Sequence, residues 1–160
     1  MSSASNYLEN KVLDHTLRNT SFSQPSALVI ALFAGTASDV LAALEAGTGS
    51  RSGTGNWGHY EITGNAYART AITFAAASGG SAASNANCTF QTASGNYNNA
   101  ASSGSTITCM AVMDTAFTPN GSTDPHTGQI LYYGALDNPK EVLSGDTFQI
   151  TSGNLTISLA

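Results

Sequence analysis

Charged side chains are scarce in this chain. Only 9% of its 160 residues are Asp, Glu, Lys or Arg, whereas an average soluble protein has ~25%. The five basic residues form no cluster and the net charge is −5, which excludes the basic surface that nucleic-acid binding requires. A surface poor in Lys and Glu resembles protein–protein interfaces, from which both residues are depleted. The composition therefore predicts a protein that works inside an assembly.

Long apolar runs and targeting segments are absent as well. The longest apolar run, Ala27–Ala34 (ALVIALFA), is far shorter than the ~18 residues that cross a membrane. The opening residues, MSSASNYLENKV, lack a basic start followed by an apolar segment, so we expect no signal peptide. These absences predict that the protein has no membrane partner and is assembled inside a cell.

Cysteine and histidine are too few and too scattered for the usual metal and hydrolase motifs. The two cysteines, Cys88 and Cys109, form no CxxC pair and are expected to be buried free thiols. A disulfide between adjacent strands is the alternative. The three histidines lie far apart, at His15, His59 and His126, and no HExxH, GxSxG or His-x-His motif is present. A nucleophile needs a positioned base, and the sequence shows none.

Two local patterns resemble ligand sites but lack the defining residues. The glycine-rich loop Thr48–Gly58 has no GxxxxGK[ST] motif and does not directly follow a strand, so a nucleotide site is not expected. The acids Asp137, Glu141 and Asp146 cluster near turns but do not match an EF-hand. We therefore expect no catalytic residue, no metal and no cofactor.

Two helices are predicted. The first spans Asn6–Asn19, where Asn6 and Glu9 have the spacing of a capping box and Asn19 ends the helix. Its apolar residues recur at helical spacing: Leu8, Val12, Leu13 and Leu17. This segment is either an anchoring arm or, as we favour, a short helix packed on a sheet. Ser38 is expected to cap the second helix, Asp39–Ala46, and Gly47 to end it.

The segment Gly64–Phe74 (GNAYARTAITF) is expected to form a central strand. Its residues alternate between two faces, which is the period of a strand. One face has Ala66, Ala68, Thr70, Ile72 and Phe74, and the other has Tyr67, Arg69, Ala71 and Thr73. Arg69 lies in its middle. Its guanidinium either extends into water over a packed stem or faces a partner.

Further strand-length segments recur at short spacing along the chain. Ala27–Ala34 is apolar on both faces and therefore central. The others are Asn87–Gln91, Thr106–Asp114, Gln129–Leu136, Lys140–Leu143, Thr147–Thr151 and Asn154–Leu159. Turn formers separate them, including Asn138-Pro139 and several residues within Thr115–Thr127. The pattern predicts an all-β, mainly antiparallel, jelly-roll-like β-sandwich in one domain, residues 1–160, with an N-terminal helical arm, residues 1–20.

Three blocks of the sequence resemble small virion proteins of tailed bacteriophages. They are SNYLENKVLDHTLRNTSFSQPSALVIALFAG, GNAYARTAITF and ILYYGALDNPKEVLSGDTFQITSGNLTISL. Such proteins are often described as tail-fibre-like, and similar β-sandwich proteins serve as capsid decoration (cement) proteins. The resemblance carries over no catalytic residue and implies a structural part of the virion.

On this basis we expect a capsid decoration protein that binds the outer surface of the phage head and stabilises the lattice of the major capsid protein. It would be assembled in the host cytoplasm and would bind the major capsid protein and itself, as a homodimer or homotrimer. By residue type, the candidate contacts are Tyr7, Arg18, Arg51, Trp57 and Arg69. Trp57 could instead cover the core.

Two other functions remain open. One is a tail-fibre or baseplate component that binds a host surface, for which exposed aromatic residues would be expected. The other is a glycan-active enzyme on a jelly-roll scaffold, which would require paired acids in a cleft.

Overall fold

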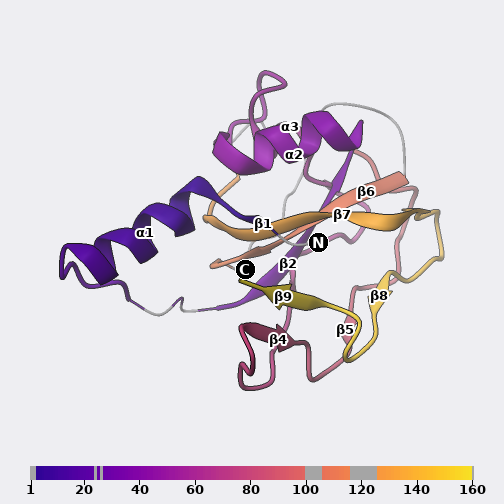
Figure 1. The fold of residues 1–160 in the computed structure, drawn as a ribbon. Helices are drawn as coiled ribbons and strands as arrows, with labels where there is room; N and C mark the ends of the chain where they lie inside the picture. Colours follow the sequence, from indigo (N-terminus) through magenta and orange to yellow (C-terminus); the bar gives the residue numbers. More distant parts are fainter. Residues whose placement is uncertain (1–2, 24, 26, 100–105, 116–125, 160) are drawn as a thin grey trace.

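A computed structural model describes residues 3–23, 25, 27–99, 106–115 and 126–159 of the chain. Its centre is an antiparallel sheet of five strands in the order β1-β7-β6-β2-β3 (Figure 1). The strands are β1 (Ser3–Ala4), β2 (Val29–Ala34), β3 (Thr70–Ala71), β6 (Thr106–Met113) and β7 (Ile130–Glu141).

Strand β2 determines the layering of the molecule. All of its residues are buried, and they alternate between two separate clusters. Val29, Ala31 and Phe33 belong to one apolar core. Ile30, Leu32 and Ala34 belong to another, on the opposite face of the sheet. The prediction of a central strand, apolar on both faces, is confirmed, and both faces of the sheet must be covered.

Two helices cover the first face (Figure 1). They are α2 (Ala37–Ala46) and the short α3 (Trp57–Tyr60). Their buried side chains complete this core against β2 and β6: Val40, Ala43, Leu44, Trp57 and Tyr60. Helix α2 stops before Gly47, as expected, but Thr36 is its N-cap and the predicted cap Ser38 lies inside the helix. Helix α3 lies where the sequence predicts only the end of a loop.

Two narrow ribbons cover the second face (Figure 1). One pairs β4 (Ser81–Ala83) with β9 (Thr156–Ser158), and the other pairs β5 (Cys88–Thr89) with β8 (Gln149–Ile150). Their apolar side chains pack toward the sheet: Cys88, Ile150 and Ile157 among them. Strands β5, β8 and β9 fall within predicted strands, whereas β4 lies inside a Gly/Ser/Ala tract with no strand pattern.

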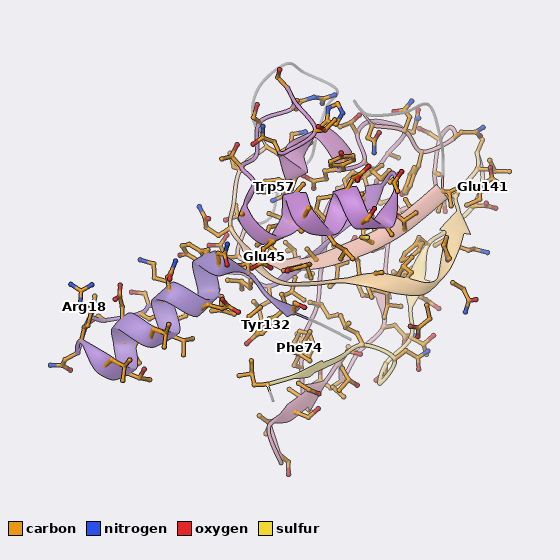
Figure 2. All side chains as sticks on the ribbon, turned by 45° about the horizontal axis from the view of Figure 1, so that its top comes forward. Arg18, Glu45, Trp57, Phe74, Tyr132 and Glu141 are labelled. Atoms are coloured by element: carbon orange, nitrogen blue, oxygen red, sulfur yellow. The ribbon has the colours of Figure 1, made fainter. Side chains whose placement is uncertain are left out.

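Helix α1 (Asn6–Leu17) extends away from this body (Figures 1 and 2). Ser5 caps it, in place of the predicted Asn6, and accepts a hydrogen bond from the Leu8 amide. Asn19 follows in the left-handed conformation, at φ 54°, which is the predicted end. The expectation of a helix packed on the sheet is wrong for most of its length, since Leu8 is its only buried residue.

The fold is therefore mixed α/β, with mostly antiparallel sheets and, in the part described, three helices. The antiparallel strands and both predicted helices are confirmed. The described residues show no closed sandwich, because helices cover one face of the sheet and short ribbons the other. The turns expected near Pro119, Asn120-Gly121 and Asp124-Pro125 lie outside the described residues.

The predicted central strand Gly64–Phe74 is mostly not a strand. Gly64, Asn65 and Ala66 all have positive φ values of 53–68° and turn the chain, and only Thr70–Ala71 pairs, as edge strand β3. Tyr67 and Arg69, from one predicted face, are buried, and so is Ile72, from the other. The sequence alternates as described, but the left-handed turn at Gly64–Ala66 prevents the segment from forming one continuous strand.

The turn predicted at Asn138-Pro139 does not end its strand. Ala135 pairs with Cys109 and Lys140 with Ile107, so β7 inserts extra residues between these two pairs and bulges. Pro139 lies in this bulge, where its missing amide removes no ladder hydrogen bond. The turn residues therefore bend β7 without terminating it.

Two fully buried tyrosines pack together beneath the sheet but differ in their hydroxyls. The rings of Tyr67 and Tyr97 meet edge to face, with centroids 5.7 Å apart. The Tyr67 hydroxyl accepts a hydrogen bond from the Leu32 amide at 3.0 Å and donates one to Glu61 at 3.2 Å. The Tyr97 hydroxyl has no hydrogen-bond partner among the described residues.

This matched pair yields a stability prediction. Tyr67→Phe should lower the free energy of unfolding by about 1–3 kcal/mol, because it leaves a buried amide without an acceptor. Tyr97→Phe removes an unsatisfied hydroxyl and should be neutral or stabilising. Urea unfolding of both variants measures the difference, and equal losses would contradict these hydrogen-bond assignments.

Candidate functional site

The exposed side of α1 carries apolar side chains. Val12, Leu13 and Leu17 are 44%, 53% and 77% exposed, although all three are large hydrophobic residues. At 100° per residue they share one side of the helix with Leu8, Thr16 and the exposed Glu9. We call the five uncharged residues of this side, Leu8, Val12, Leu13, Thr16 and Leu17, the arm face; Glu9 lies among them near the base of the helix.

Polar residues occupy the other side of α1. Arg18 at its far end pairs with Asp14 at 3.0 Å (Figure 2), but both side chains are exposed, so this pair contributes little stability. Near its base, Tyr7 is half-buried and the Lys11 ammonium lies 5.7 Å from the centre of its ring. Tyr7 and Arg18 are thus on the arm, and their role as partner contacts stays a prediction.

Lone helices of this length are unstable in water. Helix α1 has 12 residues, and isolated helices shorter than ~12–15 residues are marginal even with favourable sequences. Burial of an apolar face supplies most helical stability in proteins. The chain buries only Leu8 from this face, so packing against the body supports α1 only at its base.

An open cleft of about 600 Å³ lies on the ribbon side of the sheet. Its walls are the faces of β6 and β7 on one side and the segments around β8 and β9 on the other. Three half-buried apolar side chains lie at its surface, Met110, Tyr132 and Leu136. Tyr132 lies between the sheet and β9 (Figure 2).

The border of the cleft is polar. Its lining includes Asp137, Lys140, Gln149 and Asn154, all exposed. Along the outer edge of β7, β1 pairs only with Tyr132 and Tyr133. The cleft therefore lies beside a strand edge that is paired at one end only among the described strands.

A buried cluster of charged groups lies on the helix side, around Glu61. The Glu61 carboxylate is fully buried and accepts two hydrogen bonds from Arg69, from Nε at 2.6 Å and from Nη2 at 2.8 Å. His126 Nδ1 lies 2.6 Å from Oε2, the carboxylate oxygen that also accepts from Arg69 Nη2. Arg69 also donates to the carbonyls of Thr115 and Thr127. These bonds connect three segments that are distant in sequence.

The electrostatics of Glu61 follow from this geometry. Burial would raise the pKa of its carboxyl, but hydrogen bonds and charge from Arg69 and His126 outweigh burial, and the pKa lies below its ordinary value. The pKa of Arg69 is raised, because the interactions with Glu61 outweigh its own burial. The pair therefore stays ionised inside the protein and acts as a structural connection.

Trp57 and Arg69 are inside the fold rather than at its surface. Trp57 is 3% exposed and Arg69 is 6% exposed, and the guanidinium lies 5.6 Å from the centre of the indole ring. Trp57 thus covers the core, the second of its two expected roles. Neither expected position of the Arg69 guanidinium is observed, since it extends neither into water nor toward a surface.

Arg51, the fifth candidate contact, is half-buried in the loop before α3. Its carbonyl accepts a hydrogen bond from His59 Nδ1 at 2.9 Å, which fixes the loop to the helix. Its own Nη1 is buried without a hydrogen-bond partner within the described residues. Its role as a contact stays a prediction, and Arg51 is not among the residues that line the cleft.

Metal ligands, membrane-spanning helices and the two cysteines were the other features to check in the described residues. They contain no group of three or more His, Cys, Asp or Glu residues that could hold a metal ion. None of the helices in this part is long and apolar enough to cross a membrane. Cys88 and Cys109 are free and buried in different cores, on opposite faces of the sheet, which confirms the expected free thiols. Burial raises the pKa of the Cys88 thiol to about 11.

Sequence reasoning missed Glu61 and His126, although one signal was available. Between Arg51 and Asp114 the only charged residues are Glu61 and Arg69. Two isolated opposite charges in a long uncharged segment favour a buried pair, because a buried charge needs a partner. No comparable signal existed for the cleft, which depends on how the ribbons pack.

Comparison with known proteins identifies the family to which the sequence is similar. Residues 3–158 match the model of the family described as podophage GP4 fiber I protein gp80. No curated protein matches the chain. The match covers nearly all of the sequence, and the family is one of structural phage fibre proteins.

This finding corrects the main functional expectation. A capsid decoration protein was predicted, and the match to a fibre family overturns it. The tail-fibre alternative agrees with the match, as does the expectation of a structural virion component that is not an enzyme. The contact with the major capsid protein was expected together with the decoration role and stays an untested prediction.

The Glu61 cluster yields the second stability prediction. Glu61→Gln should destabilise the protein by about 3 kcal/mol or more at pH 7, because it leaves the Arg69 charge buried with a weaker partner. Since the pKa of Glu61 is lower in the folded state, its stabilisation is complete above about pH 4.5 and is lost as pH falls below that value.

The difference in unfolding free energy between wild type and Glu61→Gln should therefore narrow on acidification below about pH 4.5. Urea titrations at several pH values measure it. The exposed pair offers a control, because Arg18→Gln should cost at most about 1 kcal/mol at any pH. A constant difference for Glu61→Gln would show that its charge does not stabilise the fold.

Proposed function

This chain belongs to the podophage GP4 fiber I protein gp80 family, and we propose on that premise that it is a structural subunit of a phage tail fibre. Its task is to build the fibre by associating with copies of itself, as a homodimer or homotrimer. The finished fibre takes part in contact with the host surface. No chemical step is involved.

One observation supports self-association most strongly. The arm face leaves Val12, Leu13 and Leu17 exposed on a helix that is too short to be stable alone. Three of the five exposed large hydrophobic side chains among the described residues lie on this one helix, and gathered exposed apolar side chains mark interaction sites. The low content of charged residues, 9% of the chain, also favours a molecule covered by neighbours.

Location in the virion tests the fibre assignment. Antibody fragments raised against the purified chain, bound to intact particles, should label the tail fibres in electron micrographs. Labelling spread over the surface of the head would contradict the proposal. A fibre subunit should also be removed, with the fibres, when its gene is inactivated, and the heads should remain filled.

Self-association has its own test, with a control on the same helix. Leu13→Asp with Leu17→Asp places charge on the arm face, whereas Arg18→Asp changes an exposed residue on the opposite side at 100° per residue. Analytical ultracentrifugation should show oligomers for the wild type and Arg18→Asp, and monomers for the double variant. An oligomeric double variant would exclude the arm from the interface.

A further inference from the structure

Two surfaces of the isolated molecule are apolar and uncovered. One is the arm face, of which only Leu8 is buried. The other is the surface of the cleft formed by Met110, Tyr132 and Leu136, which are half-buried. Both belong to the same chain, so every copy in an assembly brings one of each.

We infer that the cleft receives the arm α1 of a second copy of this chain. The inference deepens the proposed self-association and rests on it. It names the two surfaces that meet, and it makes the interface one between unlike surfaces: the arm of one copy lies in the cleft of the next.

The width of the arm face favours a groove over a pair of arms. A coiled-coil seam needs apolar residues at a and d positions repeated over several heptads. Helix α1 has no such repeat, because Leu8 and Val12 fit one heptad frame whereas Leu13 and Leu17 fit another. Together they spread over about half of the helix circumference at 100° per residue. A face this broad is typical of a helix seated on a globular core.

The cleft has room for the side chains of such a helix. Amphipathic helices bind in apolar grooves through anchors spaced three or four residues apart, and the pairs Leu8 and Val12, and Leu13 and Leu17, have that spacing. The open cleft has a volume of about 600 Å³, which suits the anchor side chains and not the whole helix. The three half-buried apolar side chains would pack against the anchors and lose their contact with water.

The two surfaces can pair their charges in one orientation. Lys11 and Asp14 flank the arm face at helical spacing, and the exposed Glu9 lies within it. The cleft lining carries Asp137 and Lys140, so Lys11 can pair with Asp137 and an arm carboxylate with Lys140. Pairs at the rim of an interface give orientation and specificity more than affinity, so they would define the direction of the arm.

The arm does not cover the cleft of its own chain. Its base is fixed at Ser5, whose amide donates to the Leu131 carbonyl at 3.0 Å and whose hydroxyl donates to the Ile130 carbonyl. From this fixed point α1 extends outward (Figures 1 and 2). A second copy has no such restriction, and its arm can approach the cleft from solvent.

Mixing two defective variants tests the inference on the full-length chain. Leu13→Asp with Leu17→Asp disables the arm and leaves the cleft intact. Leu136→Asp disables the cleft and leaves the arm intact. Each should be monomeric alone, with self-association weakened by about 30-fold or more, as expected for an interface hot spot. Mixed together, they should form a 1:1 complex, because one supplies the cleft and the other the arm.

Leu143→Asp is the matched control for the cleft variant. Leu143 is 40% exposed, lies on the same body and is not part of the cleft lining. This variant should associate like the wild type, within about threefold. Far-ultraviolet circular dichroism and urea unfolding confirm that Leu136→Asp is folded, and Leu136→Gln provides a milder variant if it is not.

The outcomes separate this inference from the proposed function. If Leu136→Asp and Leu136→Gln both oligomerise like the wild type, the cleft is not the receptor and the inference fails, whereas self-association stands. If the mixture yields no complex although the wild type oligomerises, arms pack against arms and the inference fails again. If the wild type is monomeric at all concentrations, the proposed self-association itself is wrong.

Discussion

The requirement that both faces of the central sheet be covered explains most of this structure. Strand β2 has no polar side to turn toward water, since all of its residues are buried. Helices α2 and α3 cover one face with a continuous apolar core. Two ribbons cover the other face, but they leave the surface of β6 and β7 partly open, and this gap is the cleft. The fold of one chain therefore leaves part of its sheet open in the cleft.

The buried ion cluster shows how the chain uses its few charges. Glu61 and Arg69 form a bidentate ion pair in which neither side chain is exposed. His126 and Tyr67 contact the same carboxylate. A buried charge is costly unless it is paired and hydrogen-bonded, so the cluster tolerates few alternative arrangements. It joins the end of α3 to the residues just before β3 and to the segment that precedes β7, and thereby fixes the helix layer to the sheet. Charge is used inside the molecule to specify the fold, while much of the surface remains uncharged.

The sequence predicted the elements with strong local patterns and missed those that depend on tertiary packing. Ala27–Ala34 was recognisable as a central strand because apolar residues on both faces fit only a buried position. The C-terminal ends of α1 and α2 followed from Asn19 and Gly47. The predicted N-caps Asn6 and Ser38 lie inside their helices, which Ser5 and Thr36 precede as the N-caps. The strand predicted at Gly64–Phe74 failed because Gly64–Ala66 adopt left-handed conformations, which alternation does not reveal.

The functional assignment failed for another reason: composition indicates that a surface is covered but does not identify the neighbour. The cleft arises from an incomplete ribbon layer, and no local pattern encodes it.

The central claim is that α1 is completed by another copy of the chain, in the cleft. Amide hydrogen exchange of α1, followed by mass spectrometry at low and high protein concentration, tests it most directly, because exchange reports local opening of individual segments. The account predicts that residues 6–17 exchange rapidly in dilute protein and become protected as concentration rises, together with the segments of β7, β8 and β9 that line the cleft. Strong protection of α1 in dilute monomer, or protection that rises with no change at the cleft, would contradict it.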